Sequence, residues 1–474
     1  MAKAQSRIPF LSRRAGVGQG VAAWAGPVAR WLAAAMVVAA LCSGASAYLK
    51  RTGVLAHADY LAYWAHHCLS DDDVPDMRDE PQCHAHVDVP RAVAQNTWRG
   101  FTSAFISYVH EVSPAERPLK FAKDAVFVAI LALSAWMLAA SRSLRAIAPV
   151  SPLPVAFAVY VAIMLLVSLS SQGLMVAASG ARALSFMAVA LLAGWLAPYM
   201  ATFAWALAGL LGLQLLLLPY ELLHGIHMYQ EWSALALAGR TFGTLVHPNS
   251  MGIFAATGFA FCLCFLPRRG LLPLLAVGAI ALIGLSASAT GLACAVVLCA
   301  VMVQRTMGGA RGVGIALAFL LGVGMLALVG LPALLGRPDL FDSVASETGR
   351  LANLQQAVLG QPAAQALFGK GLGVNSNAAL SIGVAGGLPT DSSLTGLIYQ
   401  VGILGTCLFY ALLAWAGWRD RQAAPFYVAV AVCSLTLNVT ELFPVNLLLG
   451  LALARSLLRQ SRGEDFMTPV HGRR

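Results

Sequence analysis

The residue types that could do chemistry gather between Gly349 and Gly405, a polar stretch that leads into an apolar segment. It carries a cation at Arg350, a flexible glycine run at 369–373 and an acid at Asp391. A guanidinium binds phosphate oxygens through two parallel hydrogen bonds, and a carboxylate can accept a proton from a hydroxyl group. We therefore expect the working part of the protein here.

Two further arginines, Arg182 and Arg240, each lie near the end of an apolar segment. We expect both to be on the same side of the membrane as Arg350. Three guanidinium groups converging at one membrane face would suit the diphosphate of a lipid carrier. The alternative is that each arginine reaches lipid phosphate or pairs with a nearby acid such as Glu347.

A polar motif at 239–252 contains His247, Pro248 and Asn249 just before an apolar segment. This order predicts a turn followed by a helix start. Asn249 or Ser250 would cap that helix by accepting a free backbone amide. His247 would order the loop or contact substrate.

Asp391 precedes Ser392, Ser393 and another apolar segment, so it is either a helix cap or a general base at the water–lipid boundary. Glu441 is interpreted as a partner for a helix end or an arginine. Four polar residues at helical spacing predict a solvated face of a surface helix or a face toward a substrate groove; they are Glu221, His224, His227 and Glu231.

Cys68 and Cys83 lie in a long polar loop beside several histidines. A disulfide, two free thiols and a zinc site are all compatible with these residue types. We expect the disulfide, because the loop is placed outside the cytoplasm, and we expect no metal.

The composition places the chain in a membrane. Of its 474 residues, 59% are hydrophobic and 11% are charged, and the mean hydropathy is +0.73. A soluble domain carries about 25% charged residues. The net charge of +10 is spread over the ends of apolar segments, which argues against nucleic-acid binding.

The apolar segments predict an all-α polytopic fold, because about 20 apolar residues cross a bilayer as a helix. We expect about twelve transmembrane helices, near 28–48, 124–141, 153–171, 183–197, 199–219, 250–266, 271–287, 289–304, 313–334, 393–417, 426–440 and 442–458. The last two could instead form one broken hairpin.

Basic residues concentrate at alternate ends of these segments, which predicts that both termini are cytoplasmic. Residues 1–27 would form a disordered basic arm, 28–458 the bundle and 459–474 a polar tail. The main outside loops would be 49–123, 220–249 and 335–392, carrying short helices. The segment 28–48 is interpreted as an uncleaved anchor, with a cleaved signal as the alternative.

Several motifs together resemble one superfamily. They are Gly-Arg-x-x-Gly-x-x-x-His-Pro-Asn at 239–249, Arg350, Leu-Phe-Gly-Lys-Gly-Leu-Gly at 367–373, Asp391-Ser392-Ser393, and Gln-Val-Gly-Ile-Leu-Gly at 400–405. Gly180-Ala181-Arg182 is a weaker match. In this order the motifs resemble the O-antigen ligase and Wzy-type polysaccharide polymerase superfamily, over roughly residues 120–455.

The resemblance implies glycan transfer from an undecaprenyl-diphosphate-linked oligosaccharide, outside the bacterial cytoplasmic (inner) membrane, without metal or other cofactor. Arg240 and Arg350, joined by Arg182, would hold the diphosphate and stabilise its departure. Asp391 would be the base. The other substrate-binding candidates are His247, Asn249, Gly371 and Gly373.

One departure favours polymerase over ligase. Ligases of the superfamily place a histidine in the last outside loop, and this chain has none between 336 and 424. We expect polymerisation of repeat units into exopolysaccharide, capsule or O-antigen, with a chain-length regulator and export proteins as possible partners. The alternatives are a ligase to lipid or protein, and a transporter of polysaccharide or lipid carrier.

Overall fold

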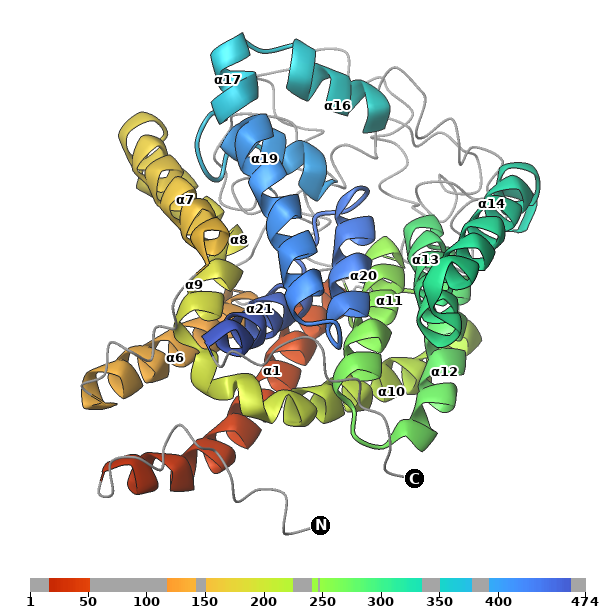
Figure 1. The fold of residues 1–474 in the computed structure, drawn as a ribbon, viewed down its shortest axis with the longest axis horizontal. Coiled ribbons are helices and arrows are strands. Elements are labelled where there is room, and N and C mark those ends of the chain that lie inside the picture. The colour runs from red at the N-terminus through yellow and green to blue at the C-terminus, as the bar shows by residue number, and fades with distance from the viewer. Residues whose placement is uncertain are drawn as a thin grey trace, which may run out of the picture.

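The computed structural model describes residues 17–51, 117–141, 151–224, 241–245, 248–334, 350–376 and 392–461. All regular structure in these ranges is helical. Figure 1 shows a bundle in which α16 and α17 lie together at the edge of the molecule farthest from the two chain termini. The all-α prediction is therefore confirmed for the described part of the chain.

Within these ranges, seven helices are long and apolar enough to cross a membrane. A bent pair, α8 (Leu174–Ala183) and α9 (Ser185–Leu192), could provide an eighth crossing. The seven candidate spans are Trp24–Ala45, Pro118–Ala139, Pro152–Ser171, Gly194–Glu221, Pro248–Phe265, Ala289–Met307 and Ser393–Arg419. They belong to helices α1 (Val17–Arg51), α6 (Arg117–Ser141), α7 (Pro152–Ser171), η3 (Gly194–Tyr199) with α10 (Met200–His224), α11 (Pro248–Phe265), α13 (Ala289–Met307) and α19 (Ser393–Arg419).

The remaining expected spans coincide with four helices outside this set. These are α12 (Leu272–Leu285), α14 (Gly309–Leu334), α20 (Ala424–Ser434) and α21 (Val445–Ser461). The segment expected at 183–197 is not one helix, because α9 ends at Leu192 and the 3-10 helix η3 follows.

Helix α11 is the centre of the bundle. In the most apolar stretch of α11, 78% of the residues are buried, whereas the corresponding value for α7, at the periphery, is 22%. It packs against α10, α12, α13 and α20. The Phe261 ring meets Phe265 and Phe426 edge to face at 4.6 and 5.2 Å between centroids. A helix buried all round needs apolar residues on every face, which its sequence supplies.

Helix α1 begins at Val17, so the disordered arm expected over 1–27 is wrong from that residue onward. The helix packs along α6 and α10, and Ala29 and Met36 are fully buried in the core. Near its end, a Cβ placed on Gly44 would lie 2.6 Å from the Cβ of Thr244. Glycine is therefore required for this close approach.

Candidate functional site

The glycine run at 369–373 docks onto a break in α19. Gly402 has φ 68° and ψ −179°, so the helix is interrupted there. The carbonyls of Tyr399 and Gln400, released by the break, accept the amides of Lys370 at 2.8 Å and Gly371 at 3.2 Å. Irregular backbone at membrane depth is tolerated where protein satisfies its polar groups, and the run does this.

Side chains complete the junction between the run and the broken helix. The Gln400 side-chain oxygen accepts the amide of Gly373 at 3.1 Å. The Tyr160 hydroxyl, from α7, donates to the carbonyls of Phe368 and Val401, both at 3.0 Å. The run and the break are therefore one hydrogen-bonded unit.

Backbone conformation and close packing explain why the two proposed substrate-binding positions, 371 and 373, are glycines. Gly371 and Gly373 have φ values of 115° and 87°. A Cβ on Gly373 would lie 2.6 Å from the Ser179 hydroxyl, and one on Gly371 would lie 3.0 Å from the Ser168 hydroxyl. Their glycine identity is explained without a substrate, so their proposed contact with one stays a prediction.

Arg350 is the first residue of α16 (Arg350–Leu359) and is half-buried. Helix α16 packs on the first half of α19, where Ala357 meets Ile398 and Tyr399 in a small apolar cluster. A short second helix, α17 (Ala363–Phe368), follows and leads into the glycine run. The chain from Arg350 to the run is thus anchored on α19 at two places.

Ser392 is the N-cap of α19, because its side chain accepts the amide of Thr395 at 3.4 Å. Ser393 donates to the Leu437 carbonyl at 3.1 Å and accepts the Val439 amide at 2.8 Å. Asp391 lies outside the described residues. Since Ser392 fills the cap position, capping is no longer needed to explain an acid at 391.

The motif at 239–249 is held by α10 where it is described. Gln214 accepts the Thr244 amide at 2.9 Å and donates to the Thr244 hydroxyl at 2.7 Å. Glu221 accepts the Phe242 amide at 3.2 Å. Because 214 and 221 are two helical turns apart, one face of α10 grips the segment 241–245.

Two expectations about this region are wrong. Glu221 is 1% exposed rather than part of a solvated face, because α10 continues to His224 and presents the carboxylate to the motif. Asn249 lies inside the first turn of α11, which begins at Pro248, and is not its cap. The fixed φ of proline suits this first position. Arg240 and His247 lie outside the described residues.

Arg182 lies on α8, which joins the glycine run to α6. A Cβ on Gly180 would lie 2.5 Å from the Leu372 Cβ, so α8 and the run are in close contact. Two residues later, Arg182 Nε pairs with Asp124 Oδ1 of α6 at 2.7 Å. The structure therefore brings Arg182, the run and the break in α19 into one continuous region.

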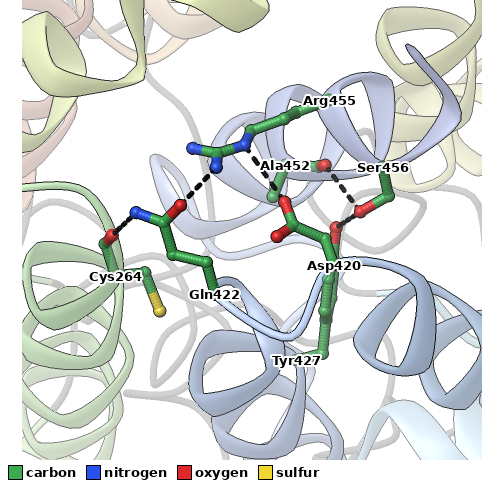
Figure 2. Close-up of polar contacts among 7 residues, drawn as sticks. All are labelled: Cys264, Asp420, Gln422, Tyr427, Ala452, Arg455 and Ser456. Carbon is green, nitrogen blue, oxygen red and sulfur yellow. Dashed lines mark hydrogen bonds and ion pairs between the residues drawn. The ribbon is translucent and has the colours of Figure 1, made fainter. Parts of the chain in front are cut away.

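A second polar cluster lies at the other end of α19 and involves residues that sequence reasoning missed. Arg455 Nε pairs with the fully buried Asp420 at 3.1 Å, and Arg455 also donates to Gln422, which donates to the Cys264 carbonyl (Figure 2). Nearby, Tyr427 and Ser456 share a 2.8 Å hydrogen bond. The cluster links α11, the α19–α20 turn and α21, and we interpret it as structural. An arginine within the apolar 445–458 run was the available signal.

No group of three or more potential metal ligands occurs in the described ranges. Cys68 and Cys83, the disulfide candidates, lie outside them. Comparison with protein-family models and with curated proteins found no match for this chain.

Proposed function

We propose that this protein polymerises lipid-diphosphate-linked oligosaccharide repeat units at the outer face of the bacterial cytoplasmic membrane. The observation that carries the proposal is the docking of the glycine run on Gln400–Gly402. These are two separate motifs of the superfamily resemblance, and here they form one unit. The same unit connects to Arg350 through α16 and α17, and to Arg182 through α8.

In the proposed reaction, arginines hold the diphosphate of the donor. Arg350, Arg240 and Arg182 supply permanent positive charge, so departure of the diphosphate needs no metal ion. Asp391 takes the proton from the acceptor hydroxyl. The hydroxyl oxygen bonds to the anomeric carbon as the carbon–oxygen bond to the diphosphate breaks, and that electron pair leaves with the diphosphate.

The proposal includes a topology. Twelve spans with both termini in the cytoplasm would put Arg182, Arg350 and the glycine run at the outer face, where translocated donors arrive. The long segment before α19 would then receive the growing glycan. A chain-length regulator and export proteins would act beside it, and membrane lipid would surround the bundle.

The broken α19 is an observation that favours a transporter as a second candidate, because transporters use discontinuous helices to bind substrates. The details argue against it. The backbone carbonyls released at the break are taken by the glycine run and Tyr160, and the Gln400 side chain holds the run by accepting the Gly373 amide. The Gly402 carbonyl accepts the Thr406 hydroxyl at 2.7 Å. Because the carbonyls at the break already accept hydrogen bonds from the protein, the break is better suited to holding the glycine run than to binding an ion.

The glycan profile of a deletion strain tests the proposal, with polymer, single repeat units and carrier-linked material resolved. A polymerase defect leaves single units on their acceptor or on carrier, without long polymer. Long polymer that accumulates on carrier would show a ligase instead. A normal profile in all three fractions would exclude both the polymerase and the ligase function.

Variants of Arg350 and Asp391 test the residue roles in the same strain. Arg350→Ala should abolish polymer while the protein stays in the membrane, and Arg350→Lys should restore little, since a point charge lacks the bidentate contact. Asp391→Asn removes the base; wild-type polymer from this variant would exclude Asp391 from the chemistry.

A further inference from the structure

The link between α20 and α21 is irregular backbone inside the bundle. It runs over 435–444, from the end of α20 at Ser434 to the start of α21 at Val445. Within it, Asn438 and Thr440 are 8% and 4% exposed. Irregular backbone in a membrane bundle occurs where protein covers it or where it lines a polar cavity. Polar side chains of this link therefore need hydrogen-bond partners.

The Asn438 side chain is held through its oxygen alone. That oxygen accepts the Thr440 hydroxyl at 2.8 Å and the Ser393 hydroxyl, which is shared with the Leu437 carbonyl, at 3.2 Å. These contacts fix which way the carboxamide points, because its oxygen and nitrogen leave one carbon in different directions. The amide nitrogen can donate twice, but it has no hydrogen-bond partner among the described residues.

Gln400 of α19 is held in the same way. Its side-chain oxygen accepts the Gly373 amide at 3.1 Å, and the residue is 4% exposed. Within the described ranges, its amide nitrogen also makes no hydrogen bond. Leaving a buried donor unpaired costs free energy. Two side chains that are more than nine-tenths buried, each with an unpaired amide nitrogen, therefore indicate a ligand that supplies oxygen acceptors.

The two amides are placed along one face of α19. Ser393, which binds Asn438, and Gln400 are seven residues apart, so they lie on the same side of the helix, about two turns or about 10 Å apart along its axis. The helix is regular between them, since the break at Gly402 comes after Gln400. The two NH₂ groups can therefore act on one elongated ligand.

We propose that the Asn438 and Gln400 amides bind a neutral oligosaccharide, each donating to oxygen atoms of the sugar chain. Separated neutral donors suit an extended polyol, whereas compact anions are bound through charged groups. Fixed amide groups of this kind orient ligands in binding sites. Gln400 binds Gly373, which packs closely on Gly180 of α8. Arg182 follows two residues later, so the sugar would lie near the arginine assigned to the diphosphate. The choice of a glycan as ligand rests on the proposed function.

The test measures binding to the full-length protein in detergent micelles with two probes. One is the oligosaccharide that mild acid releases from the host's lipid extract, and the other is inorganic diphosphate. Gln400→Glu and Asn438→Asp keep the acceptor oxygen and lose the NH₂ donor, so each should weaken oligosaccharide binding about tenfold, and the double variant about a hundredfold. Gln355→Glu changes an exposed amide of α16 and should bind like the parent protein.

Asn438→Leu and Gln400→Met separate the lost donor from the added charge. These uncharged side chains of similar size also lack the NH₂ group, so they should weaken oligosaccharide binding as much as the acidic variants do. Melting with and without oligosaccharide monitors folding, and the sugar should stabilise the parent protein more than any variant. Parent-like affinity in a folded variant at either position would overturn the site, as would a parent protein that does not bind the oligosaccharide.

The two probes also separate this inference from the proposed function. Weakened oligosaccharide binding with unchanged diphosphate binding in the uncharged variants supports a sugar site. A parallel loss of diphosphate binding in those variants would assign the amides to an anion and overturn the inference. Normal polymer in the deletion strain would refute the proposed function and leave the measured sugar binding standing.

Discussion

Replacing Gly402 with alanine should undock the glycine run from α19. The backbone at Gly402, with φ 68° and ψ −179°, lies in a region that is essentially restricted to glycine, and an alanine there costs about 1–3 kcal/mol. The new Cβ would also meet the Leu367 carbonyl oxygen and lie 2.6 Å from the Gly369 nitrogen.

The clash lies where the glycine run contacts α19, so it should push the run away from the helix. Moving the run away sacrifices the Lys370–Tyr399 and Gly371–Gln400 hydrogen bonds, worth about 1 kcal/mol each. Together with the backbone strain, the docked state should lose about 3–5 kcal/mol relative to the undocked one. That change is large enough to populate a state in which 369–373 is accessible to protease.

Limited proteolysis and thermal melting of the purified full-length protein in detergent measure this effect. Gly209→Ala in α10 is the matched control, because its Cβ would meet nothing within 4 Å. In a helix this change should be neutral or stabilise by about 0.5–1 kcal/mol. If Gly402→Ala melts and resists protease like Gly209→Ala, the break in α19 does not hold the run as described.

Three further predictions concern other contacts and use the same melting measurement. Arg455→Leu should destabilise the protein by about 3–5 kcal/mol, because it removes the arginine that is paired with the buried Asp420. Adding Asp420→Asn should recover part of this loss. If the effects of the two changes simply add, the Arg455–Asp420 ion pair does not stabilise the protein. Gln214→Leu should lower the free energy of unfolding by about 2–3 kcal/mol, because it leaves the Thr244 amide and hydroxyl without their Gln214 partner. Gln214→Glu should have an intermediate effect. Equal melting temperatures of the parent protein and both variants would show that Gln214 does not hold the segment 241–245. Ser392→Ala should cost about 1 kcal/mol and Ser392→Asp much less, since aspartate can also cap α19, and indistinguishable values would remove Ser392 from the cap.

The positions of the helices were predictable because hydrophobic length is a strong signal. A helix occurs in each of the twelve expected segments, although within the described residues seven helices, or eight with the bent α8–α9 pair, meet the length and hydropathy requirement of a complete span. The interruption at Gly402 was missed because hydropathy carries no information about φ. The hydropathy of Gln-Val-Gly-Ile-Leu-Gly predicts uninterrupted helix, and the carbonyls that the break releases are satisfied by the docked run at 369–373 and by Tyr160.

Charged residues at the ends of helices were harder to assign. Glu221 follows an apolar run, which normally indicates exposure, yet a segment about 20 positions later covers it. Lys120 and Lys123 were grouped with the loop 49–123, whereas α6 begins at Arg117 and includes both. For Glu221 the deciding contact is made by a residue distant in sequence, which local patterns could not reveal, whereas the two lysines were misplaced because the start of α6 was set too late.

The fit of Gly44 against Thr244 has a consequence for the order of membrane insertion. The two residues are about 200 positions apart, so at roughly 5–20 residues per second the ribosome needs about 10–40 s after Gly44 to deliver Thr244. During this interval α1 must remain stable in lipid without this contact. Its alanine-rich buried face, without a charged side chain among Ala29, Ala33, Met36 and Ala40, meets that requirement. The sequence of α1 is therefore constrained twice, first while its contact with the segment 241–245 is still missing and later as a fully packed member of the bundle.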